Sequence, residues 1–100
     1  MNDDLFDALA AVHRRRILVG LLEHNPRQLS EQVERDSILG RSEIDEVRLR
    51  HEHAPKLDDC GFIEWDREAG RLTRGPRFEE IEPALRLLDD NRDRLPDDWV

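Results

Sequence analysis

The side chains best suited to binding a metal are four histidines and one cysteine. His51 and His53 lie two residues apart, so on a regular helix they point to different sides and cannot hold one ion together. His13 and His24 would lie about 16 Å apart on a continuous helix, and Cys60 has no second thiol to join it. We therefore expect no metal site and no cofactor. His51 and His53 should pack beside the core, each with one ring nitrogen hydrogen-bonded. Cys60 should be a small core residue.

A basic segment in the C-terminal third of the chain could contact phosphate groups. Residues 67–77 contain four arginines and one acid, a local net charge of +3 in a chain whose net charge is -8. Such arginines would position the protein on a nucleic acid without reading its sequence. The arginines are Arg67, Arg71, Arg74 and Arg77. In the alternative interpretation they pair with nearby acids, namely Glu64, Asp66, Glu79 and Glu80.

A second run of arginines, residues 14–16, does not predict a binding patch. Consecutive helical residues spread over about 200° of the helix surface, so we expect these three to pair separately with nearby acids. The chain also lacks a glycine-rich phosphate loop, a nucleophile elbow and a cluster with metal-ligand spacing. We therefore expect no enzyme.

The composition narrows the class of protein further. The chain has 100 residues, of which 37% are hydrophobic and 40% charged, and Lys56 is its only lysine beside fifteen arginines. High acid and scarce lysine favour a protein adapted to concentrated salt. No apolar run reaches the roughly 18 residues that span a bilayer, and the acidic start does not resemble a secretory signal. We expect one cytoplasmic domain without disulfides.

Apolar spacing predicts four helical regions. Residues 4–24 form one helix or two, begun by Asp3 or Asp4 and ended by His24-Asn25-Pro26. Ser30 caps a short helix that carries Leu29 and Val33, and Ile38-Leu39-Gly40 forms a turn. Ser42 and Asp45 resemble a capping box for a helix from Glu43 to about Cys60, ended by Gly61 and made irregular by Pro55. A last helix follows Gly75-Pro76, contains Pro83, and leads to a frayed tail at residues 95–100.

Between the last two helices the pattern changes to that of a hairpin. Residues 62–66 and 71–73 alternate like strands, and residues 67–70 form a loop that contains Gly70. The fold class expected is α+β, mostly helical. Its parts are a helical region at 1–61, a two-stranded hairpin at 62–74 and a C-terminal helix at 77–95.

This order of elements, together with four sequence segments, resembles the ArsR-type winged-helix regulators. At the start of the chain, the segments that resemble this family are Leu5-Phe6-Asp7-Ala8-Leu9-Ala10 and Arg14-Arg15-Arg16-Ile17-Leu18. Just before the hairpin and at its start, the segments that resemble this family are His53-Ala54-Pro55-Lys56-Leu57 and Gly61-Phe62-Ile63. The opening Gly75-Pro76-Arg77-Phe78 of the last helix resembles a group of small ArsR-like proteins of halophilic archaea, mostly predicted regulators. The resemblance covers residues 4–95 and implies a winged helix-turn-helix that binds double-stranded DNA as a homodimer.

The resemblance implies a recognition segment at residues 42–53 and a wing at 65–73. If Ile44, Val47, His51, Ala54 and Leu57 face inward, the outward face is Asp45, Arg48, Glu52, Lys56 and Asp59, which is mixed in charge. The side chains expected to contact DNA are Arg41, Ser42, Arg48, Arg50, His51, Lys56, Arg67, Arg71 and Arg74. The rival interpretation, favoured by the net charge of -8, is a winged-helix module that binds proteins and no longer binds DNA.

The apolar residues of the last helix predict a dimer interface. It carries an apolar seam with spacings of three, four and three residues, which is longer than so small a core needs. We expect part of the seam to cover the first helix and the remainder to meet a second subunit. The interface residues expected are Leu5, Phe6, Leu9, Phe78, Ile81, Leu85 and Leu88.

Overall fold

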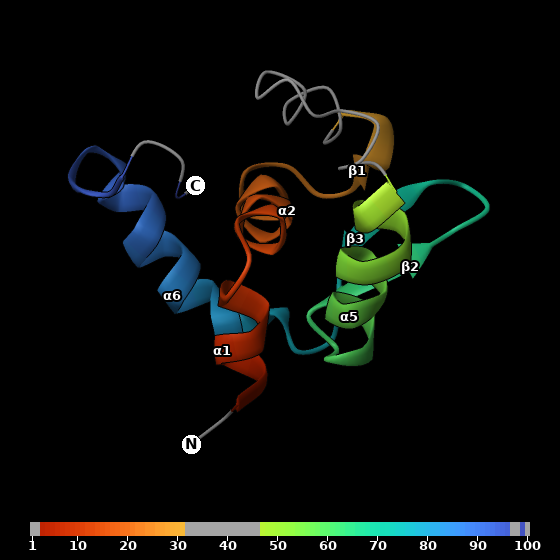
Figure 1. Ribbon diagram of the computed structural model, residues 1–100, viewed down its shortest axis with the longest axis horizontal. Helices are drawn as coiled ribbons and strands as arrows, with labels where there is room; N and C mark the ends of the chain where they lie inside the picture. Colours follow the sequence, from red (N-terminus) through yellow and green to blue (C-terminus); the bar gives the residue numbers. More distant parts are fainter. Residues whose placement is uncertain (1–2, 32–46, 97–98, 100) are drawn as a thin grey trace.

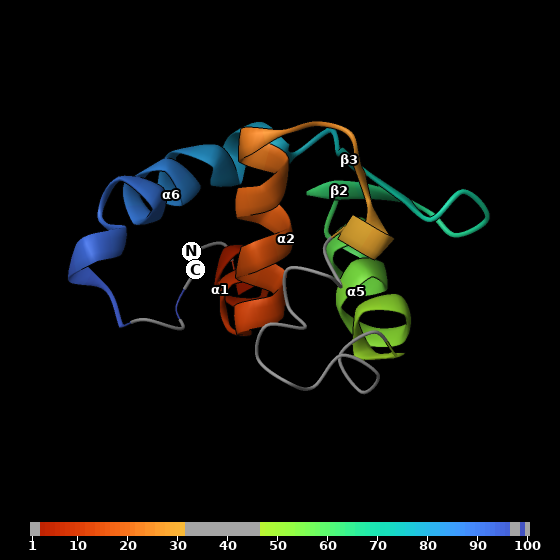
Figure 2. The same ribbon diagram turned by 90° about the horizontal axis from the view of Figure 1, so that it is seen from above.

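The computed structural model describes residues 3–31, 47–96 and 99, and within these it is an α+β fold made mostly of helix. The helices are α1 (Asp3–Leu9), α2 (Val12–Glu23), α5 (Ala54–Asp59) and α6 (Phe78–Asp90), with a π-helical turn η1 (Leu49–His53) and a 3-10 turn η2 (Arg92–Arg94). The strands are β1 (Arg27–Gln28), β2 (Ile63–Asp66) and β3 (Arg71–Arg74). Figures 1 and 2 show α2 in the middle of the molecule, with α6 on one side and α5 with the sheet on the other.

The N-terminal helical region consists of two helices. Residues 10 and 11 interrupt it, so α1 and α2 lie at an angle to each other (Figure 1). Helix α1 is already helical at Asp3, so Asp3 and Asp4 supply negative charge to its first turn and are not its cap. Helix α2 ends at Glu23, with the His24 backbone N–H donating to the Gly20 carbonyl oxygen, where the sequence predicted the stop.

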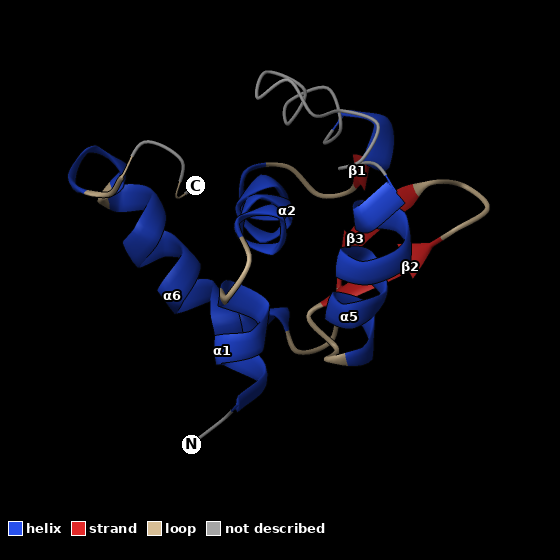
Figure 3. Cartoon of the chain, viewed as in Figure 1, coloured by secondary structure: helices blue, strands red, loops and turns tan. Residues whose placement is uncertain are grey.

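The sheet has three antiparallel strands in the order β1-β3-β2 (Figure 3). The hairpin of β2 and β3 was predicted, and it turns through residues 67–70 with Gly70 at a φ of 64°. The third strand, β1, was missed because two residues are too few to show a strand period. It pairs with β3 through Arg27 opposite Leu72, so the expected two-stranded wing is part of a three-stranded sheet.

The helix before the hairpin contains a π-helical turn that changes which side chains face the core. Pro55 has no N–H to donate and crowds the preceding turn, and η1 ends two residues before it. The extra residue in this turn advances the helix phase. Leu49 and His53 are therefore buried, whereas Val47 is 58% exposed and His51 is exposed. The predicted inward positions of Val47 and His51 are wrong, while those of Ala54 and Leu57 are confirmed.

The core lies where α2, α5, the sheet and α6 meet. It includes Ile17, Leu18 and Leu21 from α2 together with Phe62 and Leu72, all fully buried. Helix α6 is strongly amphipathic and adds its own apolar side. The fully or almost fully buried side chains of α6 are Phe78, Ile81 and Leu85.

Several predicted details fall at the limits of the described chain. Residues 29–31 are helical, so Ser30 lies inside a helix and does not precede it. Helix α6 ends at Asp90 and not near residue 95, and Trp99 packs against Arg15 although the tail was expected to fray. The remaining predictions for this region concern positions outside the described residues. They are Val33, Ile38, Leu39, Gly40, Arg41, Ser42, Glu43, Ile44 and Asp45.

Candidate nucleic-acid interface

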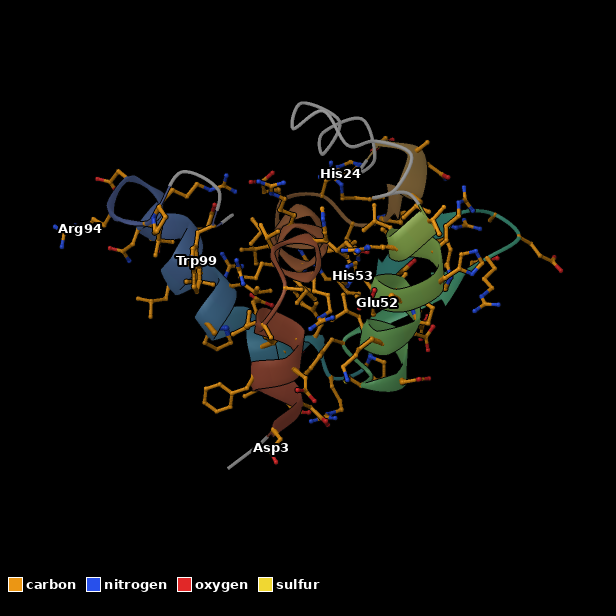
Figure 4. All side chains as sticks on the ribbon, in the orientation of Figure 1. Asp3, His24, Glu52, His53, Arg94 and Trp99 are labelled. Carbon is orange, nitrogen blue, oxygen red and sulfur yellow. The ribbon has the colours of Figure 1, made fainter. Side chains whose placement is uncertain are left out.

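The outer face of the η1–α5 segment carries charges of both signs. Arg48, Glu52, Lys56 and Asp59 are all exposed, as the helical pattern predicted. Figure 4 shows Glu52 and His53 on this segment, with His53 on the side toward α2. An arginine can donate two hydrogen bonds to guanine and a carboxylate can accept from cytosine, so such a face can read base edges.

Two more of the expected contact residues, His51 and Arg50, lie on this segment, and Lys56 has an ion pair within the protein. His51 is exposed and available, and Arg50 is half-buried and already engaged within the protein. The Lys56 Nζ atom lies 3.7 Å from Asp7 Oδ2 on α1, with both side chains about half exposed. An ion pair that long and exposed contributes less than about 1 kcal/mol, so Lys56 can exchange Asp7 for another anion.

The hairpin presents two exposed arginines. Arg67 begins the turn, and Arg71 begins β3 with its guanidinium 3.7 Å from Asp66 Oδ2. Asp66 also accepts a hydrogen bond of 3.1 Å from the Ala69 backbone N–H, which orders the turn. Figures 1 and 2 show the tip of the hairpin at the end of the molecule farthest from α6.

A hydrogen bond joins the hairpin to the helix. The Trp65 backbone N–H on β2 donates to Asp58 Oδ2 on α5 at 2.7 Å, beside an open hollow of about 810 Å³. The hollow is lined by Pro26, Asp58, Glu64, Trp65, Asp66, Arg67, Glu68, Arg71 and Thr73. Trp65 was not predicted to do more than fill the strand, although its place two residues after Ile63 puts both on one face. The bond links β2 of the hairpin directly to α5.

The other two arginines of the basic segment, Arg74 and Arg77, stabilise the fold. Arg74 Nε donates to the Leu21 carbonyl oxygen at 2.9 Å and its NH2 to the Leu22 carbonyl oxygen at 3.0 Å. The guanidinium also lies 5.0 Å from the centre of the Phe78 ring. Arg74 therefore closes the C-terminal end of α2, and its contact with DNA stays a prediction.

Arg77 is held by acids at the start of α6. It donates to Glu80 Oε2 at 2.8 Å and to Asp4 Oδ2 at 3.0 Å, and a further bond reaches the Cys60 carbonyl oxygen. The hydrogen bonds to Glu80 and then Asp4 raise the pKa of Arg77, and Arg77 lowers the pKa of Glu80. The half-buried Cys60 thiol has its pKa raised by burial and then by the charge of Asp4.

Arg14 and Arg15 of α2 also stabilise the fold, and their described hydrogen bonds do not go to the predicted acidic partners. Arg14 and Arg15 are buried, and each donates to main-chain carbonyl oxygens. Arg14 Nε reaches the Asp7 oxygen at 2.9 Å, and Arg15 reaches those of Leu9 and Trp99. The Arg15 guanidinium lies 4.0 Å from the centre of the Trp99 ring. Burial, followed by the charges of its arginine neighbours, lowers the pKa of Arg15.

His53 is the most buried ionisable side chain described, at 4% exposed. Its Nδ1 atom lies 3.2 Å from the Arg14 guanidinium and its ring centre lies 5.4 Å from that of His13. Burial is the main cause that lowers the pKa of His53. The prediction that His53 packs beside the core with one ring nitrogen hydrogen-bonded is thus confirmed.

The described parts of the chain contain neither a metal-ligating cluster nor a membrane-spanning helix. Across residues 3–31, 47–96 and 99, no three His, Cys, Asp or Glu side chains lie close enough to hold a metal ion. None of the helices described there is long and apolar enough to cross a membrane.

Comparison with known proteins identifies a family. A family model described as a domain of unknown function, DUF7344, matches residues 6–73. The chain belongs to the DUF7344 family. No curated protein matches the chain, and no solved structure matches it.

The DUF7344 match covers both parts of the candidate interface. It runs from α1 to β3 and therefore includes the η1–α5 face, the hairpin and the contact between Arg14 and His53. It ends before α6 begins at Phe78.

The side chains expected at a dimer interface divide by burial into three groups. Phe78, Ile81 and Leu85 are buried in the core of the subunit itself, and their place in a dimer interface stays a prediction. Leu5 and Leu9 are partly buried against that core, and Leu88 is partly buried as well. Among the described residues of this chain, the exposed large apolar side chains of α1 and α6 are Phe6, at 62%, and Leu87, at 66%.

Proposed function

We propose that this DUF7344 protein is a DNA-binding transcription regulator with a winged helix-turn-helix fold of the ArsR type. The observation that carries the proposal is the pairing of two exposed elements. The η1–α5 face and the arginine-bearing hairpin are joined by the bond from Trp65 N–H to Asp58. A helix and a hairpin held together in this way can enter a groove and rest on the adjoining backbone at the same time.

The helical face supplies the sequence-reading contacts in this proposal. Arg48 and Lys56 are exposed cations, and Glu52 lies on the same exposed face. Each well-formed contact of this kind to a base edge discriminates by about 1–3 kcal/mol. Arg48→Ala should therefore change which base is preferred at one position of the binding site.

The hairpin supplies the contacts to phosphate groups. Arg67 and Arg71 remain as the cations of the wing, since Arg74 closes α2 and Arg77 is held by acids. Phosphate contacts position a protein but carry no base information. Loss of the two hairpin arginines should thus weaken binding to all DNA sequences alike.

A homodimer through the α1 and α6 side completes the proposal. The hairpin lies at the end of the molecule away from α6 (Figures 1 and 2), so a pair joined near α6 would carry its two hairpins outermost. Phe6 and Leu87 are the exposed apolar side chains on that side. If the two η1–α5 segments of the dimer lie about 34 Å apart, which is one turn of DNA, the binding site must be palindromic.

The test compares two double variants with equal loss of charge. Arg67→Ala with Arg71→Ala removes the hairpin cations, and Arg86→Ala with Arg94→Ala removes two exposed arginines from the α6 end. Binding to fluorescent genomic fragments is measured by anisotropy in high potassium. We expect the first variant to bind more weakly and the second to bind like the parent. Equal effects of the two variants would mean that general charge, and not the hairpin, governs binding.

A protein-interaction module is the second candidate, and the charge distribution favours it. The net charge is -8, and Glu52, Asp58 and Asp59 are exposed on the η1–α5 segment. Such a surface repels DNA phosphates at low salt. If the parent protein binds no genomic fragment at any potassium concentration while folded, the interaction module becomes the better proposal.

A further inference from the structure

A buried cluster on the inner side of the η1–α5 segment holds that segment on the first two helices. Arg14 on α2 donates through Nε to the Asp7 carbonyl oxygen of α1 and directs NH1 at His53 Nδ1 of η1. One guanidinium therefore links three helical elements. Figure 4 shows His53 between α2 and the η1–α5 segment.

The contact between Arg14 and His53 fixes where the imidazole carries its proton. A guanidinium donates hydrogen bonds and accepts none, and it keeps its charge in proteins. His53 Nδ1 must therefore be the acceptor, with the ring neutral and its proton on Nε2. Protonation of Nδ1 would remove the acceptor and place a second positive charge 3.2 Å from the Arg14 guanidinium.

The charges around His53 come from its own helix and from the helices packed against it. On its own helix, Glu52 favours the charged imidazole and Arg48 opposes it, and from α2 both Arg14 and His13 oppose it. From α1, Asp7 turns its carbonyl oxygen to Arg14 and its carboxylate to Lys56. Burial exceeds each of these influences, and the pKa of His53 in the folded protein lies below its ordinary value of 6.5.

We propose that His53 is a proton switch that sets how firmly the η1–α5 segment is held on α2. At neutral pH the unprotonated ring accepts from Arg14 and the segment is docked. At acid pH the protonated ring is repelled by Arg14, and the segment loosens. The consequence for DNA rests on the proposed function: if this segment reads DNA, acid weakens sequence-specific binding.

The direction of the pH effect follows from linkage. An imidazole whose pKa is lower when docked takes up a proton more readily in the released state. Docking is therefore at full strength above the ordinary pKa of 6.5 and is lost as the pH falls through the docked pKa.

The test uses two histidine-to-asparagine variants on the same helix. His53→Asn keeps an acceptor near the position of Nδ1 but cannot gain a proton. His51→Asn makes the same chemical change at an exposed position and serves as the control. Amide hydrogen exchange of residues 49–57 is measured at about pH 7.5 and about pH 5.5 in roughly 1 M KCl, where charges at the surface are strongly screened. Exchange rates are converted to protection factors, which removes the intrinsic pH dependence of exchange.

We expect protection of residues 49–57 to fall by about threefold or more on acidification in the parent and in His51→Asn. In His53→Asn it should stay level. Equal falls in all three proteins would overturn the proposal. NMR titration of the parent's own imidazoles is a second measurement that needs no variant to fold. His53 must show its proton on Nε2 and a pKa below its ordinary value of 6.5, and a pKa at or above that value would also overturn the proposal.

A DNA measurement separates the switch from the proposed function. If acid releases the segment and also lowers specific DNA affinity in the parent but not in His53→Asn, both are supported. If acid releases the segment but the folded protein binds no DNA at any pH, the switch is supported and the proposed function fails.

Discussion

Arg74→Ala should destabilise the fold by about 3 kcal/mol, although the residue lies in a basic segment of the sequence. Each of its two hydrogen bonds to the carbonyl oxygens of Leu21 and Leu22 contributes about 1 kcal/mol. A cation at the C-terminal end of α2 adds about 0.5 kcal/mol by its interaction with the helix dipole. The contact with the Phe78 ring adds about 0.5 kcal/mol more.

Arg71→Ala is the matched control, because Arg71 begins the same strand. The ion pair between Arg71 and Asp66 is 3.7 Å long and half exposed, so its removal should cost less than about 1 kcal/mol. Urea unfolding in high potassium measures both variants. In a domain of this size the loss expected for Arg74→Ala lowers Tm by more than about 10 °C.

The contrast between the two variants decides whether Arg74 is structural. A free energy of unfolding for Arg74→Ala within about 0.5 kcal/mol of the parent would refute the reasoning. The free energy of unfolding of Arg74→Lys should fall between those of Arg74→Ala and Arg71→Ala. An ammonium keeps the charge but cannot donate in a fork to two carbonyl oxygens. DNA-binding tests of the hairpin must therefore leave Arg74 in place, because a variant that lacks it loses affinity through unfolding.

The other predictions concern the core, the dimer and salt. Leu87→Asp should leave the fold intact and give a monomer by light scattering, whereas Leu85→Asp should fail to fold because Leu85 is fully buried; a parent that is already monomeric at high concentration contradicts the dimer. Gly75→Ala should cost about 2 kcal/mol in urea unfolding, because its Cβ would lie 2.5 Å from the Gly61 carbonyl oxygen; an unchanged midpoint contradicts this. Folding and specific DNA binding should both require molar potassium, with affinity flat or rising over that range, because cations must screen the carboxylates of a chain with net charge -8. A steep loss of affinity in a protein that stays folded contradicts it.

The local pattern of apolar residues predicted the elements but not the side on which each one packs. Alternation around Ile63 and Leu72 with a glycine in the loop was enough to predict the hairpin, and the helical class of the fold followed from apolar spacing. The phase of the η1–α5 segment could not be predicted, because a π-helical turn adds a residue that no regular period anticipates. Val47 and His51 were misplaced for this reason.

The partners of the buried and half-buried side chains were harder still to predict. An amphipathic seam such as that of α6 has the same sequence whether it covers its own subunit or another, so Leu85 could be assigned to either. Arg14 and Arg15 were expected to meet carboxylates because only side chains are visible as partners in a sequence. Their actual acceptors are main-chain carbonyl oxygens, which every residue possesses.

The same arginine contacts bear on how this domain can change over evolutionary time. An ion pair makes two positions depend on each other, so that substitutions at the two positions are correlated in a family. Arg14, Arg15 and Arg74 donate to main-chain carbonyl oxygens, which no substitution removes. These oxygens belong to Asp7, Leu9, Leu21 and Leu22. The dependence is one-sided: the arginines are constrained while the acceptor positions vary independently of them. Contact prediction from correlated substitutions would therefore miss these hydrogen bonds between α1, α2 and β3.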